Sequence, residues 1–409
     1  MPARKRRRRS RRRHLRRRWY FLLVVLPLAL VVVLLTRRRS HVTKLSATKS
    51  AASHRNLPQR APGAGVSGAP QIAAAYNAVI RRSGGESAWL KRAAEPAGNE
   101  SGRQTNGEVL ALGPAEPVIM RAVEQQAAHD GLRLQVQPAD PPTGDAPRTT
   151  VELSVSEGNR IVCVWRVRQV PRLYRASIVI DDLGQDLKPA DELLKIPYPL
   201  TFSILPNLPA SRETAVAANA AGREVMLHLP MEPLAAQVNP GEGAIRVGMR
   251  SPEVDRLIEG DLASVPYAAG VNNHMGSRAT SDPALMAEVM KELASRRLYF
   301  IDSRTAASTV AFDAARQTGI PAFYRSVFLD DTENVEYTLA QLQRFRAAVE
   351  QHGEALAIGH PHPTTITALH EFLPQLGRDD IELVPASQLA VAPGAARLAA
   401  AVHSRSGGD

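Results

Sequence analysis

Between residues 177 and 384, short apolar runs alternate with stretches of helical pattern, and many runs end on a carboxylate, imidazole or carboxamide. Buried parallel strands have this pattern because helices cover both faces of such a sheet. The candidate strands are 177–181, 200–205, 224–229, 268–273, 298–302, 326–330, 355–359 and 381–385. Polar groups at the C-terminal ends of such strands are typical of a (β/α) barrel active site. The sequence therefore predicts an α/β barrel with reactive groups at its mouth.

The basic character of the chain is confined to its N-terminal end. Residues 1–39 hold 15 of the 51 Lys and Arg and none of the 40 Asp and Glu, so the rest has a formal charge of −4. A mildly acidic globular part lacks the basic surface that nucleic acids require. We therefore predict no nucleic-acid partner.

Residues 19–36 form an uninterrupted apolar stretch that reaches about 27 Å as a helix, close to the thickness of a bilayer core. The basic arm 1–18 precedes it, so the positive-inside rule places this arm in the cytoplasm and the rest in the periplasm. We predict a single-pass protein of the bacterial inner membrane. A cleaved signal peptide is the alternative, but Arg37-Arg38-Arg39 stands where a small-residue cleavage site belongs.

The remaining chain divides by composition. Residues 37–106 are rich in Ala, Ser, Gly and Pro and predict a flexible linker, within which 71–82 could form a short helix. Residues 107–170 predict a small α/β domain with a helix at 117–130, and 393–409 predict a flexible tail. The barrel itself is expected over 171–392.

Asp181 and Asp182 are adjacent at the end of the first barrel strand. Two carboxylates this close do not both stay charged without a proton or a cation between them. A metal resolves the conflict if one Asp binds it and the other accepts a proton from bound water. An Asp-Asp turn that caps a helix is the alternative.

Three further segments carry candidate ligands. His228 and Glu232 are four residues apart and can share a metal on one helical turn, although Pro230 favours a loop there. His274 follows Asn273 and precedes Ser277, in a polar rim that suits a metal or an oxygen-rich substrate. A rim His and a loop held by Asn turns are the alternatives.

His360 and His362 end a late strand and are two residues apart, so both can face the mouth. Either could bind a metal or protonate a leaving group. Weaker candidates for substrate contact or structure are Asp302, Ser303, Arg304, Arg325, Asp330 and Asp331.

Five motifs together resemble the divergent polysaccharide deacetylases, the YibQ-like branch of the NodB-type superfamily. They begin at Val179, His228, Asn272, Phe300 and Ile358, and read VIDDLG, HLPMEP, NNHMGS, FIDS and IGHP. The resemblance covers roughly residues 174–390. It implies a distorted (β/α) barrel of seven strands, where the residue pattern alone suggests eight.

The resemblance also implies roles. Asp181 would be the base, Asp182 a metal ligand, His228 a second ligand and His360 the acid. The family's second histidine of a His-x-x-x-His pair is replaced by Glu232, so His274 is the expected third ligand and Glu232 the reserve. The family's arginine-proline motif is not apparent.

These inferences predict a membrane-anchored, metal-dependent hydrolase that removes acyl groups from an envelope polysaccharide. Mixed nitrogen and oxygen ligands favour zinc. Asn273, Ser277, Asp302, Arg325 and His362 are expected to contact substrate or to serve as reserve ligands. The alternatives are a non-catalytic glycan-binding or scaffold barrel and an amidohydrolase-type barrel that uses His360 and His362.

Overall fold

The computed structural model describes residues 69–92, 106–113, 115–139 and 150–391. The expected transmembrane span 19–36 and the tail 393–409 lie outside these residues. No helix within the described part of the chain is both long and apolar enough to cross a bilayer.

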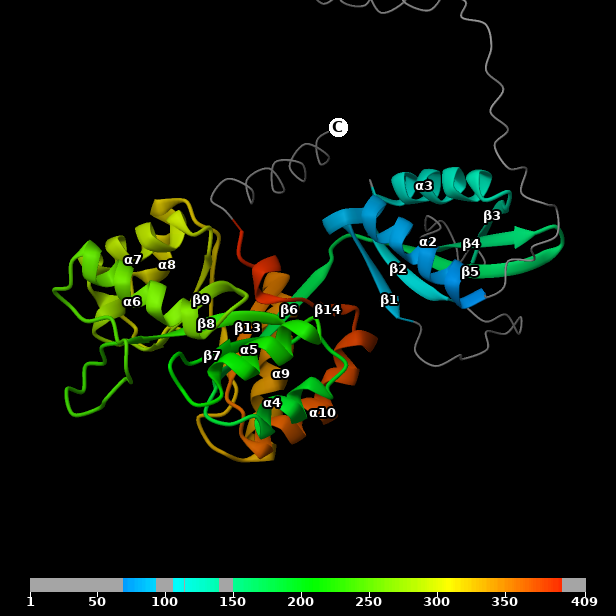
Figure 1. Cartoon of the computed structure of the whole chain (residues 1–409). Helices are drawn as coiled ribbons and strands as arrows, with labels where there is room; N and C mark the ends of the chain where they lie inside the picture. The colour runs from blue at the N-terminus through cyan, green and yellow to red at the C-terminus, as the bar shows by residue number, and fades with distance from the viewer. Residues whose placement is uncertain (1–68, 93–105, 114, 140–149, 392–409) are drawn as a thin grey trace, which may run out of the picture. The chain divides into compact units, whose positions relative to one another are not determined.

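The first folded part is a five-stranded sheet in the order β1-β2-β5-β4-β3 (Figure 1). The β2–β5 pair is parallel, and the other pairs are antiparallel. Helices α2 and α3 pack against the sheet in one apolar cluster with Trp165. The strands and helices are β1 (Ala88–Arg92), β2 (Gly107–Leu112), β3 (Arg133–Pro138), β4 (Thr150–Glu157), β5 (Arg160–Val170), α2 (Ala69–Gly84) and α3 (Ala115–His129).

The short helix expected at 71–82 is present as α2, but the predicted flexible linker is wrong for residues 69–92, which form α2 and β1 and belong to the folded part. Ile72, Tyr76, Val79 and Ile80 recur at helical spacing and are all buried. The Trp165 indole donates to Asn77 Oδ1 at 2.8 Å, which ties α2 to the sheet. The Ala-rich composition that suggested flexibility is therefore a helix with one apolar face.

The second sheet has nine strands, and all its pairs are parallel (Figure 1). Its order is β11-β10-β9-β8-β7-β6-β13-β12, and β14 pairs with β6. All eight expected strands are present, and β11 is an additional one. The strands are β6 (Tyr174–Leu183), β7 (Thr201–Ile204), β8 (Glu224–Met231), β9 (Ala268–Met275), β10 (Tyr299–Asp302), β11 (Ala322–Tyr324), β12 (Val327–Phe328), β13 (Glu354–Gly359) and β14 (Ile381–Leu383).

The two end strands of this sheet, β11 and β12, are consecutive in the chain. The Arg325 amide donates to Asp302 O at 2.9 Å, and the next amide, of Ser326, donates to Leu356 O at 2.7 Å. Neighbouring residues therefore bond to β10 on one side and to β13 on the other. With β11 and β12 counted as one position and β14 left off the path, the sheet closes through this short segment into a distorted barrel of seven strand positions, as the resemblance implies.

Helices cover the outer face of the barrel. Alternate residues of a strand belong to two different apolar clusters. Ile178 and Ile180 pack with the helices, whereas Val179 packs with Ile301 and Ile358 in a smaller cluster. Successive side chains of a strand point to opposite faces, so this division follows from the backbone. The helices are α4 (Lys188–Leu194), α5 (Ser211–Ala220), α6 (Ser251–Ser264), α7 (Pro283–Ser295), α8 (Ala311–Thr318), α9 (Val335–His352) and α10 (Pro363–Arg378).

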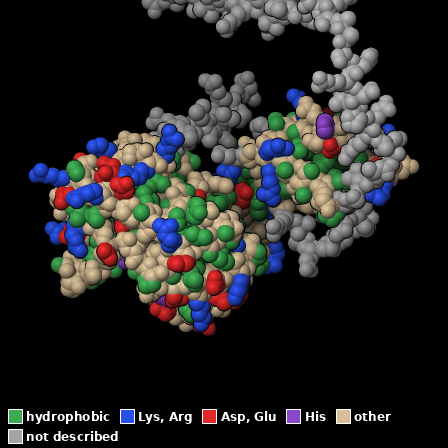
Figure 2. All heavy atoms as spheres, in the orientation of Figure 1, with side chains coloured by type: hydrophobic (Ala, Val, Ile, Leu, Met, Phe, Trp, Pro, Cys, Tyr) green, Lys and Arg blue, Asp and Glu red, His purple; other side chains and the backbone are tan. Residues whose placement is uncertain are grey.

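The C-terminal segment closes the end of the barrel where the strands begin. The Ala386 amide donates to Thr201 Oγ1 at 3.0 Å, and the Ser387 amide donates to Glu224 Oε1 at 3.1 Å. Thr201 and Glu224 begin β7 and β8. The opposite end, where the strands finish, is therefore left for the mouth. On the face shown in Figure 2, described side chains of both charges are interspersed.

Gly270 in β9 provides a test of this packing. A Cβ atom there would lie 2.4 to 2.5 Å from ring carbons of Tyr299, whose hydroxyl donates to Glu224 Oε1 at 2.9 Å. Because the ring is anchored, we expect Gly270→Ala to lower the free energy of unfolding by about 1–3 kcal/mol. Urea titration measures the change.

Gly260 is the matched control, because it lies in α6 and a Cβ there meets nothing within 4 Å. Gly260→Ala should raise the free energy of unfolding by up to about 1 kcal/mol through helix propensity. Equal effects from the two variants would contradict the packing described for Tyr299.

Candidate functional site

Both Asp181 and Asp182 reach the mouth because β6 is irregular at its end. The pairing of β6 with β7 shifts register between Ile180 and Leu183, and Asp182 has a φ of 57°. The left-handed backbone turns the Asp182 side chain away from the alternation of a regular strand. Both carboxylates therefore approach the same atom, His228 Nε2, Asp181 Oδ2 at 3.6 Å and Asp182 Oδ1 at 3.1 Å.

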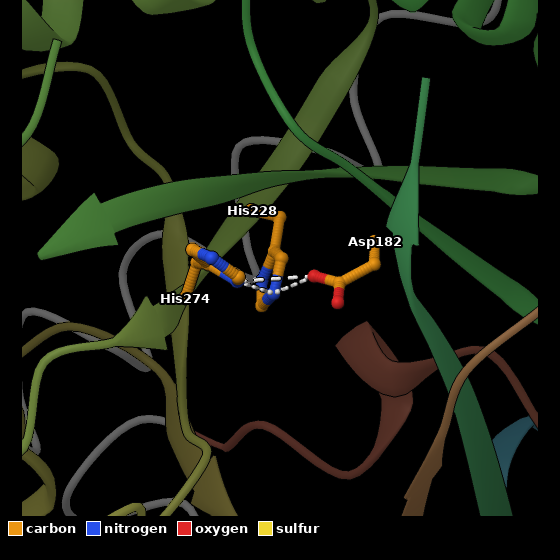
Figure 3. A group of neighbouring side chains, drawn as sticks. All are labelled: Asp182, His228 and His274. Carbon is orange, nitrogen blue, oxygen red and sulfur yellow. Dashed lines mark hydrogen bonds and ion pairs between the residues drawn. The ribbon is translucent and has the colours of Figure 1, made fainter. Parts of the chain in front are cut away.

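Asp182, His228 and His274 meet from three strands, β6, β8 and β9 (Figure 3). Asp182 Oδ1 lies 3.1 Å from His228 Nε2 and 3.0 Å from His274 Nδ1. The two imidazole nitrogens are 3.1 Å apart. The three atoms thus form a nearly equilateral triangle, and the convergence expected from the sequence is observed.

This triangle fits a divalent cation. Ligand atoms bound to tetrahedral zinc at about 2.0–2.1 Å lie about 3.3 Å from one another, close to the sides observed here. Asp182 Oδ1 is buried and has no well-aligned hydrogen-bond donor among the described residues, although both imidazoles are near. One carboxylate oxygen and two imidazole nitrogens are also a ligand set that zinc accepts. The three residues could therefore hold zinc and leave further coordination positions open.

The close approach of Asp182, His228 and His274 also shifts the pKa values of Asp182 and His228. Burial acts to raise the pKa of Asp182, but its contacts with His228 and His274 outweigh burial and lower that pKa well below its usual range. Burial acts to lower the pKa of His228, but the charges of Asp181 and Asp182 outweigh it and raise that pKa.

His360 stands on another side of the same carboxylate, with its Nε2 atom 3.7 Å from Asp182 Oδ2. Its Nδ1 lies 3.0 Å from Asp330 Oδ1, and its backbone amide donates to Asp330 Oδ2 at 2.6 Å. The Thr365 hydroxyl also donates to Asp330 Oδ2, at 2.6 Å. Asp330 therefore fixes the imidazole and leaves Nε2 directed toward the cluster.

Asp330 also changes the ionisation of His360. Burial acts to lower the pKa of His360, but the hydrogen bond to Asp330 and nearby carboxylates raise it to about 9. The imidazole therefore carries a proton at neutral pH and can serve as a general acid. Asp330 was only a weaker candidate from the sequence, although it closely follows the short strand β12.

The structure does not bring Glu232 to the cluster. Its carboxylate accepts from the Val247 amide at 2.8 Å and pairs with Arg278 at 2.9 Å. β8 continues through Met231 as a strand, not as the loop that Pro230 suggested, and this carries Glu232 past the triangle. The third residue that joins Asp182 and His228 is His274 instead.

Asn273 and Ser277 are engaged in local structure. Asn273 donates to Met275 O at 2.8 Å and accepts from the Ser303 amide at 2.9 Å. Ser277 Oγ accepts from the Leu234 amide at 2.9 Å. Both residues support the loops around the mouth.

Asp302 and Arg325 support the loop after β10. Asp302 accepts from the Arg304 amide at 2.8 Å and from Thr309 Oγ1 at 3.0 Å. Arg325 Nε donates to Ser303 O at 2.6 Å. The Arg304 side chain does not pair with Asp302 but lies over the Tyr324 ring, 3.6 Å from its centroid.

His362 lies beside His360, with ring centroids 5.8 Å apart, and its Nδ1 is 3.6 Å from Glu333. His362 groups with Asp330 and His360 rather than with Asp182. The ligand atoms of these three residues lie within 4.8 Å of one another, so they form a second group that could hold a metal ion. Asn272, rather than the expected Asn273, contacts both Asp181 and His228.

The barrel is the part of the chain that matches known proteins. Residues 178–390, more than half of the chain, match the family model described as divergent polysaccharide deacetylase. The chain belongs to the divergent polysaccharide deacetylase family. This confirms the resemblance inferred from the five motifs.

Individual relatives agree with this assignment. The chain is 41% identical over 216 residues to the uncharacterized protein YibQ of Escherichia coli (strain K12), a match that covers 53% of this chain and 67% of YibQ. It is 38% identical over 214 residues to an uncharacterized protein of Haemophilus influenzae, covering 51% and 74% of the two chains. A solved structure, the uncharacterized protein ATU2773 of Agrobacterium tumefaciens C58, has 22% identity and a TM-score of 0.51, and covers 53% of this chain and 89% of its own. That structure supports the fold.

Proposed function

We propose that this chain is a zinc-dependent deacetylase that removes an acyl group from a carbohydrate polymer of the cell envelope. One observation carries the proposal: a nearly equilateral Asp-His-His triangle has a second carboxylate, Asp181, and a protonated imidazole, His360, beside it. A metal-binding group, a base and an acid are the three functions that acyl hydrolysis by water requires.

Asp181 is placed to serve as the base. Its Oδ2 lies 3.6 Å from His228 Nε2, at the edge of the triangle, and the residue is only 3% exposed. A bound divalent cation would supply Lewis acidity, which lowers the pKa of water and stabilises negative charge on the acyl oxygen. Asp181 would accept the proton of that water.

His360 is placed to serve as the acid. Its Nε2 faces the cluster while Nδ1 is fixed by Asp330, so the proton it delivers is the one on Nε2. Collapse of the tetrahedral species needs a proton on the leaving nitrogen or oxygen, and an imidazolium within reach supplies it.

The anchored location is part of the same proposal. The apolar stretch 19–36 and the basic arm before it support a single-pass inner-membrane protein with the barrel in the periplasm. Envelope polysaccharides are found in that compartment. Fractionation of cells that produce the full chain, followed by protease treatment of spheroplasts, tests it; a barrel protected in intact spheroplasts would contradict it.

The activity is tested by zinc content and by acetate release from N- and O-acetylated glycan oligomers. We expect one bound zinc per wild-type chain and measurable release. Asp181→Asn should keep the zinc and lose most of the release. A wild type that binds both zinc and glycan but releases no acetate would contradict deacetylation and favour a glycan-binding role.

Zinc affinity should increase with pH, and the sign follows from His228. Because its pKa is raised in the metal-free protein, zinc must displace a proton from this imidazole, whereas Asp182 is already ionised. Below the raised pKa we expect the association constant to rise by up to about tenfold per pH unit for one displaced proton. Calorimetry in two buffers of different ionisation enthalpy measures the proton released; no release at neutral pH would contradict the assignment.

A further inference from the structure

The Asn272 carboxamide is fully buried and lies between Asp181, the proposed base, and His228, a proposed zinc ligand. Its Nδ2 donates to Asp181 Oδ1 at 2.8 Å. Its Oδ1 lies 2.8 Å from His228 Nδ1 and accepts the Ser203 hydroxyl at 2.8 Å. One amide therefore contacts the proposed base, a proposed zinc ligand and a buried hydroxyl.

The orientation of this amide is determined by its neighbours. An ionised Asp181 carboxylate only accepts hydrogen bonds, so the atom facing it must be the amide nitrogen. The reversed amide would place Oδ1 against a carboxylate oxygen, with no proton between them.

The orientation in turn selects the tautomer of His228. With Oδ1 facing Nδ1, that imidazole nitrogen must carry a hydrogen, which leaves the Nε2 lone pair of the neutral ring directed at Asp182 and His274. In a metal site, such a partner fixes the ring and raises the basicity of the ligating nitrogen.

We propose that Asn272 is a positioning residue that holds Asp181 and orients the His228 lone pair at the same time, thereby coupling the base to the metal triangle. This inference rests on the proposed function, but it concerns only how the Asn272 amide positions Asp181 and His228. If the Asn272 amide only satisfied the hydrogen bonds of its neighbours, its loss would lower stability without separate effects on the base Asp181 and on zinc binding by His228.

Two substitutions separate the duties. Asn272→Ala removes both contacts, so we expect zinc affinity to fall by about 10–100-fold and acetate release at saturating zinc to fall at least about tenfold. Asn272→Asp keeps an acceptor for His228 Nδ1–H but loses the amide donor to Asp181. It should bind zinc within about threefold of wild type or more tightly, yet show the reduced acetate release at pH 8.

Zinc affinity is measured by competition with a chromophoric chelator. In the ¹⁵N-labelled zinc form, the buried His228 Nδ1–H should give a slowly exchanging signal in the wild type and in Asn272→Asp, but not in Asn272→Ala. Asn273→Ala is the matched control, since it removes an equally buried amide from the next position of β9. It should change the unfolding midpoint but not zinc affinity.

The outcomes distinguish this inference from the function on which it rests. A wild type that binds zinc but releases no acetate removes the proposed function, while the zinc affinities and the His228 signal still test Asn272. Wild-type zinc affinity in Asn272→Ala would overturn the inference and leave the deacetylase proposal intact. If Asn272→Ala does not fold, a parallel loss of affinity and turnover in Asn272→Asp would overturn it.

Discussion

Replacing Asp182 with asparagine should weaken zinc binding by at least about 100-fold, which corresponds to about 2.7 kcal/mol. The carboxylate supplies the only negative charge among the three triangle residues, and its Oδ1 atom is within 3.1 Å of both imidazole nitrogens. An amide oxygen is a weaker ligand for zinc and leaves the positive charge of the cation uncompensated. Acetate release should fall with the metal content.

Asparagine is the appropriate replacement because of the backbone at this position. Asp182 has a φ of 57°, and Asn adopts this left-handed region readily whereas alanine is penalised there. Asp182→Asn therefore tests the charge and the ligand, while Asp182→Ala would combine that loss with backbone strain. Competition with a chromophoric chelator, together with metal analysis of the purified protein, measures the effect.

Glu232→Gln is the control for this experiment. Glu232 was the reserve ligand expected from the sequence, but its carboxylate bonds to the Val247 amide and to Arg278. We expect zinc affinity within about threefold of wild type, since this carboxylate is outside the triangle. Tight zinc binding in Asp182→Asn, or its loss in Glu232→Gln, would show that the ligand set is assigned incorrectly.

The sequence predicts the barrel strands well because burial on both faces leaves a continuous apolar run that ends at a polar residue. β11 was missed because it is only three residues long and shares its strand position with β12. α2 was predictable as a short helix from its apolar spacing, but β1 was missed because alanine, glycine and proline dominate the surrounding composition.

The candidate site was predictable where a residue type identifies its own chemistry, as for Asp182, His228, His274 and His360. The role of a residue was not predictable where it depends on which face of a strand the side chain occupies. Asn272 and Asn273 are adjacent, and only Asn272 shares the face of β9 that carries His274, because alternate residues point the same way. Asp330 was underestimated because its importance depends on a contact with His360, 30 residues away in the chain.

His360→Gln should lower kcat by about 10²–10⁴-fold, the usual contribution of a positioned general acid. Zinc affinity should change little, because His360 is not part of the triangle and its Nε2 lies 3.7 Å from the second oxygen of Asp182. Glutamine keeps a polar group of similar reach without a titrating proton. Steady-state acetate release and zinc competition on the same preparations separate the two effects.

Asp330→Asn should shift the pH dependence rather than remove activity altogether. Burial opposes a proton on His360, and the hydrogen bond to Asp330 is the largest influence that raises its pKa to about 9. Without the Asp330 charge, burial dominates and the pKa of His360 falls. The acid form is active, so the alkaline limb of the kcat/KM profile should move to lower pH, with the largest loss near pH 8.

The same substitution should change stability with a defined sign. His360 has a raised folded-state pKa, so its pairing stabilises the fold fully below the unfolded value near 6.5 and is lost as pH rises through about 9. Asp330 has a lowered pKa, so its contribution is present above about pH 4 and is lost on acidification. Asp330→Asn should therefore lower the melting temperature most between about pH 4 and 6.5.

The pH dependence of kcat/KM and that of the melting temperature together identify the role of the His360–Asp330 pair. A histidine that only supports the rim of the barrel would give the stability change but leave the alkaline limb of the activity profile in place. A general acid whose proton is held by Asp330 must change both, and in the same variant. An unshifted alkaline limb in Asp330→Asn, with zinc bound and the fold intact, would exclude His360 as the group that protonates the leaving atom.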